Sequence, residues 1–205
     1  MRGGSPLPVC EGCGTRTDEA HIARRATRLE LASRLRPTRI RVLFLDGAPP
    51  SRIEDYFYRP ALNPADRSLG ARRYFEELMK AAVIAIAANS QEATLLAEFQ
   101  RKGFFLTYAI ECPFEEQDDP KGALRRLAPT VMKRVQSVYD PAYVVPLSQP
   151  TADLIRLFGM IGWGDRLVLD NGLPFIDSYL ADPRRSSSAG KSLGERIKAA
   201  LAYLP

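Results

Sequence analysis

The sequence has only one histidine, three cysteines and no long hydrophobic run. An odd number of cysteines does not suit the paired disulfides of a small secreted protein, and residues 1–8 lack the apolar core of a signal peptide. The longest apolar stretch, Ala81–Ala88, is far shorter than the roughly 20 residues that a helix needs to cross a bilayer. We therefore expect a cytoplasmic protein with no membrane partner.

Positive charge is concentrated near the start of the chain. The whole chain carries a formal charge of +5. Residues 1–41 hold nine arginines and four acidic residues, which is also +5, so the remaining 164 residues sum to zero. An Arg-rich segment on a neutral body suits a polyanion such as nucleic acid, and a solvated helix face is the alternative explanation.

Strand-like and helix-like segments alternate along the 205 residues. Apolar and β-branched runs predict strands at Ile40–Leu45, Phe104–Ile110, Ala142–Pro146 and Arg166–Asp170. Amphipathic spacing and capping residues predict helices at Glu19–Leu35, Leu69–Ala88, Glu92–Lys102, Pro120–Val138, Thr151–Phe158 and Leu193–Tyr203. This order predicts an α/β fold, a three-layer α/β/α sandwich with a four-stranded, mainly parallel sheet.

No internal repeat or break in composition divides the chain. We expect a single domain over residues 1–205, in which residues 1–37 form a metal knuckle and an Arg-rich helix. Residues 38–205 then form the α/β/α body.

A rigid loop follows the first predicted strand. Asp46–Pro50 reads D-G-A-P-P, and the aromatic triplet Tyr56, Phe57 and Tyr58 comes soon after it. The glycine permits a turn closed to other residues, and the two prolines stiffen the loop. Open α/β sheets bind their ligands at the carboxyl ends of strands, so we expect this loop to form the floor of a binding site.

A second candidate site lies near the start of the chain. Cys10 and Cys13 are separated by two residues, and Gly12 and Gly14 allow the loop to fold back on an ion. His21, the only histidine, follows shortly after. Thiolate and imidazole ligands together suit tetrahedral zinc in a closed, structural site. Free thiols and a surface histidine are the alternative.

Four motifs occur in order between residues 40 and 180. They are L-D-G-A-P-P with Y-F-Y (45–50 and 56–58), G-F-F-L-T with E-C-P (103–107 and 111–113), Y-V-V-P-L (143–147) and P-F-I-D-S (174–178). In this order they resemble the uracil-DNA glycosylase superfamily, and more narrowly an uncharacterised branch of it. The resemblance implies the same sandwich fold and a site that holds a base outside the nucleic-acid stack.

The residues that carry the chemistry of that superfamily are altered in this chain. When the chain is aligned with the superfamily's G-E-x-P-G motif, Gly47 stands where the superfamily has an acidic residue. Tyr108 stands where many relatives have the amide side chain that reads the base. The histidine of its H-P-S motif has no counterpart. The resemblance therefore implies a protein that binds nucleic acid, a nucleobase or a nucleotide. Excision of a base would need Asp46 or Glu111 to take over the role of the missing acidic residue. A metal-stabilised domain that binds a small molecule or a protein is the third possibility.

The predicted ligand-binding residues come from the loop, the aromatic triplet and the strand ends. They are Gly47, Ala48, Pro49, Pro50, Tyr56, Phe57, Tyr58, Tyr108, Glu111, Pro174, Phe175 and Ser178. For the triplet, packing into the core is the alternative to stacking on a base. The predicted phosphate contacts are Arg24, Arg25, Arg28, Arg184, Arg185 and Lys191, the last three in the place of the superfamily's DNA-probing loop.

The resemblance also bears on the metal site. In the iron–sulfur branch of the superfamily, the CxxC pair meets a third cysteine after the second strand and a fourth on the next helix. Cys10, Cys13 and Cys112 match the first three, but the fourth position falls near Leu127 or Ala128, which cannot bind a metal. We therefore predict zinc held by these three cysteines and His21, with an iron–sulfur cluster as the alternative.

Overall fold

A three-stranded parallel sheet forms the centre of the computed structural model, which describes residues 7–59, 66–114, 119–176 and 190–204. The central strand, β1 (Val42–Asp46), lies between β2 (Phe104–Tyr108) and β3 (Tyr143–Pro146). Residues 42–45 are fully buried, as expected for a strand covered on both faces. The predicted α/β class and parallel sheet are confirmed.

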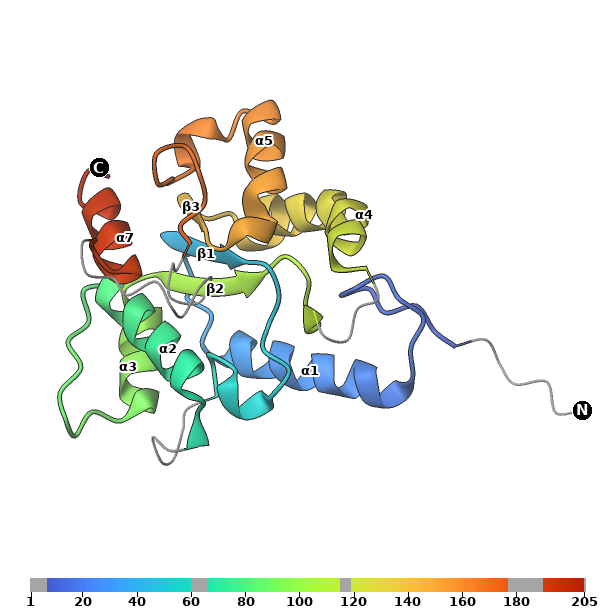
Figure 1. Ribbon diagram of the computed structural model, residues 1–205, viewed down its shortest axis with the longest axis horizontal. Helices are drawn as coiled ribbons and strands as arrows, with labels where there is room; N and C mark the ends of the chain where they lie inside the picture. The colour runs from blue at the N-terminus through green and yellow to red at the C-terminus, as the bar shows by residue number, and fades with distance from the viewer. Residues whose placement is uncertain (1–6, 60–65, 115–118, 177–189, 205) are drawn as a thin grey trace, which may run out of the picture.

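Six α-helices of the described chain surround the sheet. They are α1 (Glu19–Arg34), α2 (Leu69–Ala81), α3 (Glu92–Arg101), α4 (Pro120–Lys133), α5 (Ala152–Met160) and α7 (Leu193–Leu201). Figure 1 shows α1, α2 and α3 on one side of the sheet and α4 and α5 on the other. The arrows of β1 and β2 point toward the side where the N-terminal segment lies, and β3 runs parallel to β1. No described helix is long and apolar enough to cross a membrane.

The predicted fourth strand is wrong. Leu167 makes only one isolated bridge to Val144 of β3, and the chain then turns away at Asn171 and Gly172, both of which have positive φ angles. It returns at Phe175, which bridges Leu147. Pro174 precedes this contact and has no N–H group to extend a ladder. The outer edge of β3 is therefore covered by two short contacts.

The second helix is shorter than predicted. It ends at Ala81, and Val83 adopts a left-handed conformation with φ 55°. The Val83 and Ile84 amides donate to the carbonyls of Lys80 and Met79, the pattern of a Schellman cap. Val83 is 60% exposed, so this residue of the predicted helix lies outside the core.

The fourth predicted helix also changes character along its length. α4 continues as one stretch of π-helix, Arg134–Tyr139, which ends at Asp140 in a left-handed conformation. This wider turn places Arg134 toward the end of β2, where it donates to the Tyr108 carbonyl. The π-helix therefore positions a side chain that braces the site described next.

Candidate functional site

The N-terminal residues form a tight knuckle. Val9 pairs with Arg16 in an antiparallel bridge, and the Cys10 amide donates to the Thr15 carbonyl over 2.8 Å. Gly14 closes the turn with φ 74°, a conformation that favours glycine. This turn directs the Cys10 and Cys13 side chains into the protein, where both are buried.

The other two candidate ligands come from separate elements. His21 lies in the first turn of α1, where the Asp18 side chain accepts a hydrogen bond from its backbone amide over 2.8 Å. Asp18 is therefore the N-cap of the helix. Cys112 follows β2, and the knuckle reaches the same segment because the Glu111 amide donates to the Gly12 carbonyl. The four side chains are all buried.

The structure brings these four ligand atoms together. They all lie within 4.8 Å of one another, and none of the three cysteines forms a disulfide. The Sγ atoms of Cys10 and Cys112 are 3.7 Å apart, and His21 Nε2 lies 3.5 Å from Cys13 Sγ and 3.1 Å from Cys112 Sγ. A tetrahedral ion with bonds of 2.0–2.3 Å separates a nitrogen from a sulfur ligand by about 3.5 Å and two sulfur ligands by about 3.8 Å. The predicted ligand set is therefore confirmed as compatible with a metal site.

The electrostatics of this cluster favour a cation. Burial raises the pKa of the Cys112 thiol well above its ordinary value, and the neighbouring thiols of Cys13 and Cys10 raise it further. Metal ligation needs the thiolate form, which a positive ion between the sulfurs would stabilise.

Two arginines brace the segment that carries Cys112. Glu111 accepts hydrogen bonds from Arg25 over 2.7 Å and from Arg134 over 2.6 Å, and its side chain is only 9% exposed. Arg25 also covers Gly12, where an added Cβ would lie 2.4 Å from its Nε. Arg25 and Glu111 therefore join α1, the knuckle and the end of β2, and neither lines the pocket that we describe next.

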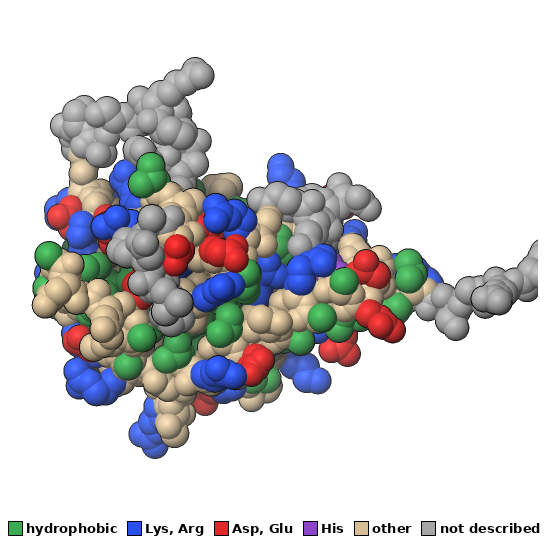
Figure 2. All heavy atoms as spheres, turned by 90° about the horizontal axis from the view of Figure 1, so that it is seen from below, with side chains coloured by type: hydrophobic (Ala, Val, Ile, Leu, Met, Phe, Trp, Pro, Cys, Tyr) green, Lys and Arg blue, Asp and Glu red, His purple; other side chains and the backbone are tan. Residues whose placement is uncertain are grey.

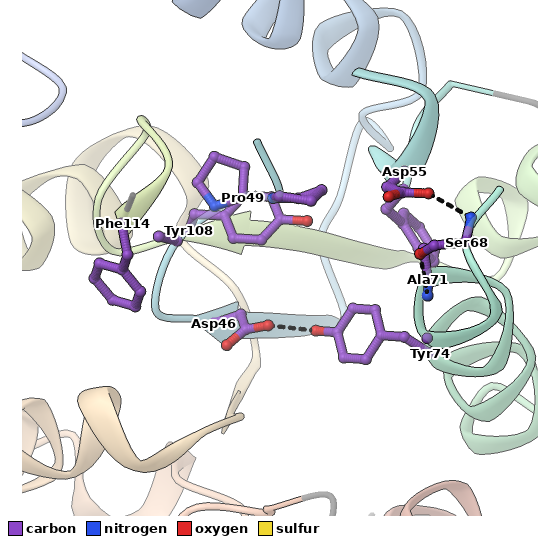
Figure 3. Close-up of a pocket in the computed structure, with 12 residues that line it drawn as sticks. Asp46, Pro49, Asp55, Ser68, Ala71, Tyr74, Tyr108 and Phe114 are labelled. Atoms are coloured by element: carbon purple, nitrogen blue, oxygen red, sulfur yellow. Dashed lines mark hydrogen bonds between the residues drawn. The ribbon is translucent and has the colours of Figure 1, made fainter. Parts of the chain in front are cut away.

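A pocket of about 350 Å³ opens at the carboxyl ends of β1 and β2 (Figure 3). Residues of the D-G-A-P-P loop, the start of α2 and the end of β2 line it: Asp46, Ala48, Pro49, Pro50, Asp55, Phe57, Ser68, Gly70, Ala71, Tyr74, Tyr108 and Phe114. The structure thus brings together most of the predicted loop residues with Phe57 and Tyr108. Phe114, Tyr74 and the start of α2 were not predicted, because no local pattern marks them as neighbours of the loop.

Asp46 lies on the floor of the pocket. Its Oδ2 atom accepts a hydrogen bond from the Tyr74 hydroxyl over 2.7 Å, and its Oδ1 atom accepts one from the Gly47 amide over 2.6 Å (Figure 3). Burial raises the pKa of the Asp46 carboxyl above its ordinary value, and the nearby Ser148 hydroxyl together with the hydrogen bonds from Tyr74 and Gly47 partly offsets this effect. The pocket therefore holds an acid that is easier to protonate than a surface aspartate.

Gly47 is enclosed by two neighbouring loops. A Cβ at this position would lie 3.0 Å from the Phe114 ring and 3.2 Å from Pro150. Gly47 therefore has no room for a larger side chain unless Phe114 and Pro150 move.

Ser148 is a residue that the sequence analysis missed. It follows β3 with φ 72° and ψ 150°, a combination that is almost restricted to glycine. Its hydroxyl is buried beside Asp46 without a well-formed hydrogen bond. Nothing in the sequence around it distinguishes this serine from an ordinary helix cap.

The aromatic triplet packs into the core, which corrects the prediction that it forms an exposed stacking surface. Tyr56, Phe57 and Tyr58 are 1–3% exposed. The Tyr58 hydroxyl donates to the Leu106 carbonyl and accepts from its amide. Of the three, Phe57 alone lines the pocket.

Arg28 is also a correction. Predicted on the exposed side of its helix, it is 3% exposed and donates to the carbonyls of Pro50 and Ser51 over 3.1 and 2.8 Å. It therefore holds the rim of the pocket from α1 and is not placed to bind phosphate.

The remaining predicted residues lie elsewhere. Pro174 and Phe175 are buried beside β3 and do not line the pocket, which corrects that prediction. Arg24 and Lys191 are exposed. Ser178, Arg184 and Arg185 lie outside the described residues.

Comparison with known proteins finds no family model, curated protein or solved structure that matches the chain. The functional argument therefore depends on the sequence motifs and on the geometry of the two neighbouring sites.

Proposed function

We propose that this chain is a uracil-DNA glycosylase-like protein that binds a nucleobase, carried by nucleic acid or a nucleotide, in the pocket beside Asp46. The observation that carries the proposal is the pocket itself, at the carboxyl ends of two parallel strands. Its volume of about 350 Å³ is at the lower end of the range for small-molecule sites, which suits one flat ring.

The lining supports a neutral, hydrogen-bonding ring. Pro49, Pro50 and Phe114 supply apolar and aromatic walls, and Asp46 supplies a polar floor. No lysine or arginine is among the residues that line the pocket in the described chain. A phosphate group would meet two carboxyl groups there, Asp46 and Asp55, and no cation, so the base and not its phosphate is the part that fits.

The same geometry favours binding over typical excision chemistry. The superfamily's acidic position is the enclosed Gly47, and both oxygens of Asp46 already accept hydrogen bonds. Asp46 nevertheless lies where a carboxyl group could face a bound nucleoside. An active glycosylase that uses Asp46 is therefore the second candidate.

Binding can be tested with a single-stranded oligonucleotide that contains one uracil and a matched one with an abasic site at the same place. We expect the uracil strand to bind more tightly. Phe114→Ala should weaken that binding about 5- to 100-fold, since stacking on an aromatic ring contributes about 1–3 kcal/mol per base. Tyr203→Ala, which truncates an aromatic ring that is 89% exposed, is the matched control and should change nothing.

Equal affinity for the two strands would contradict the proposal. Formation of abasic sites from the uracil strand, abolished in Asp46→Asn, would instead establish the second candidate. A protein that binds neither strand would favour a metal-stabilised domain with another ligand.

We further propose that the metal is zinc in a structural role. Three sulfur ligands and one nitrogen ligand, all buried and close together, suit a closed, tetrahedral zinc site. Ligand atoms that all lie within 4.8 Å of one another surround a single ion more readily than a four-iron cluster. Metal analysis should find one zinc per chain, lost in Cys13→Ser. Iron with acid-labile sulfide would refute zinc.

A further inference from the structure

A second concave surface lies at the opposite edge of the sheet from the pocket. It is a groove of about 830 Å³, formed by residues 36 and 38–41 before β1, residues 138–143 up to the first residue of β3, and Arg166. The pocket lies at the carboxyl ends of the strands, whereas this groove lies at their amino ends. Strands of five residues separate the two sites by about 17 Å.

The groove is strongly basic. Four arginines line it, Arg36, Arg39, Arg41 and Arg166, and Asp140 is the one acidic residue among its lining. The formal charge of the lining is therefore four positive charges less one negative charge, or +3. Arginine groups in a concave surface concentrate positive potential and attract anions.

Two of the four arginines hold the groove in shape. The Arg36 guanidinium lies over the Tyr139 ring at 5.1 Å and donates to the Val138 carbonyl. Arg166 pairs with Asp140 over 3.3 Å and stacks on Trp163 at 4.4 Å. These contacts fix the floor and one wall.

The other two arginines are available to a ligand. Arg39 and Arg41 are exposed, and neither guanidinium has a hydrogen bond or ion pair within the described parts of the chain. They come from one short segment, so their charges lie close together at the groove.

The excess positive charge of residues 1–41 is thus exposed in this groove more than on α1. Arg25 and Arg28 of α1 are engaged with Glu111 and with the carbonyls of Pro50 and Ser51. On the face seen in Figure 2, basic and acidic side chains are interspersed and form no continuous basic patch.

We propose that this groove binds the sugar–phosphate backbone of a single-stranded nucleic acid. Guanidinium groups match phosphate geometry with paired hydrogen bonds. The half-buried rings of Tyr139 and Tyr143 stand beside the arginines, and single-strand sites combine such aromatic rings with a basic groove. A concave surface suits a flexible single strand better than the broad, rigid outline of a duplex.

The test uses the double variant Arg39→Gln/Arg41→Gln and a matched control, Arg125→Gln/Lys133→Gln. The control removes two exposed positive charges from α4, outside the groove. Binding of fluorescent oligo-dA and oligo-rA is measured by anisotropy over a series of salt concentrations. Adenine strands contain no uracil, so the measurement does not depend on the proposed base specificity of the pocket.

For a single strand, the slope of log K against log salt is about −0.7 for each phosphate contact. We expect the groove variant to reduce the magnitude of the slope by about 1.4, because two contacts are lost, and the control to leave it unchanged. Comparison of the two strands then shows whether DNA or RNA is preferred.

Three results would overturn the proposal. They are an unchanged slope in the groove variant, an equal loss in groove and control variants, and no measurable binding of either strand at low salt. If heparin displaces the oligonucleotide but the groove variant binds the oligonucleotide as well as the wild type does, the binding is a general attraction of polyanions to the protein surface.

Discussion

Ser148 is held in a backbone conformation that non-glycine residues rarely adopt. Its φ of 72° and ψ of 150° carry a cost of about 1–3 kcal/mol for an L-residue. The conformation persists because the Ser148 amide donates to the Phe175 carbonyl, and its own carbonyl accepts from Thr151. Strain of this kind occurs most often at binding and catalytic sites, and Ser148 lies beside Asp46.

We expect Ser148→Gly to be more stable than Ser148→Ala by about 1 kcal/mol, because both variants lose the hydroxyl but only glycine relieves the strain. Urea denaturation of the two variants measures the difference. An alanine variant as stable as the glycine variant would show that the position is unstrained.

Asp46 predicts a pH dependence of stability. Burial raises its pKa in the folded protein above the value near 4 of an unfolded chain. The folded state therefore binds the proton more tightly, so this group stabilises the fold most below pH 4, and the contribution is lost as pH rises through the folded pKa. Asp46→Asn mimics the protonated form and removes this titration.

The difference in melting temperature between the wild type and Asp46→Asn should accordingly favour the wild type most near pH 4 and fall toward neutral pH. Thermal unfolding of both proteins between pH 4 and pH 8 tests this. A difference that stays constant, or that changes in the opposite direction, would show that the carboxyl is not the perturbed group.

At the scale of elements, Glu111 joins three segments that are distant in sequence. It accepts from Arg25 of α1 and Arg134 of the π-helix, and it lies next to Cys112 at the end of β2. The two arginine side chains are only 20% and 15% exposed, so loss of Glu111 would leave two poorly solvated positive charges near each other.

We expect Glu111→Gln to lower the free energy of unfolding by about 3 kcal/mol, since breaking a buried ion pair leaves its partner uncompensated. Glu30→Gln breaks an exposed pair with Arg34 on α1 and serves as the control, with little expected change. Chemical denaturation compares them. Equal effects would mean that the Glu111 network is no stronger than a surface ion pair.

The starts of elements were more predictable than their ends. Asp18 and Ser68 begin α1 and α2 as their side-chain chemistry indicates. The end of α2 was not predictable, because Val83 takes a position where glycine is usual. The missing fourth strand depends on where the chain turns beyond Val168, which apolar composition does not specify.

In the candidate sites, residues marked by a local sequence pattern were predictable, whereas residues placed by long-range packing were not. The CxxC spacing and the single histidine indicated three of the four candidate metal ligands, and the fourth, Cys112, was implied only by the resemblance to the iron–sulfur branch. Arg28 was misplaced because arginine is usually exposed, and only the carbonyls of Pro50 and Ser51 explain its burial. Tyr74, Phe114 and Ser148 reach the pocket region from three different segments, and long-range packing of that kind leaves no local pattern.

At the scale of the whole molecule, the candidate metal centre and the pocket share the same supporting elements. Cys112 lies between Tyr108 and Phe114, which both line the pocket. α1 carries His21 into the metal centre and Arg28 to the pocket rim. Loss of the metal should therefore loosen the pocket as well as the knuckle.

Removal of the metal with a chelator should lower stability by about 4 kcal/mol if the ion is normally bound at a thousandfold excess over its Kd. Hydrogen exchange should then rise in residues 10–21, 50–51 and 108–114, while β1, β3 and the contact between α2 and α7 stay protected. Increased exchange confined to the knuckle would show that the two sites are independent.

The spacing of the metal ligands has a consequence for biosynthesis. Three of them lie within the first 21 residues, and Cys112 follows His21 by 91 positions. During translation the early ligands leave the ribosome while the last has yet to be made, so the nascent chain carries an open coordination sphere until the second strand emerges. Metal supply and thiol protection during that interval should govern the yield of correctly loaded protein.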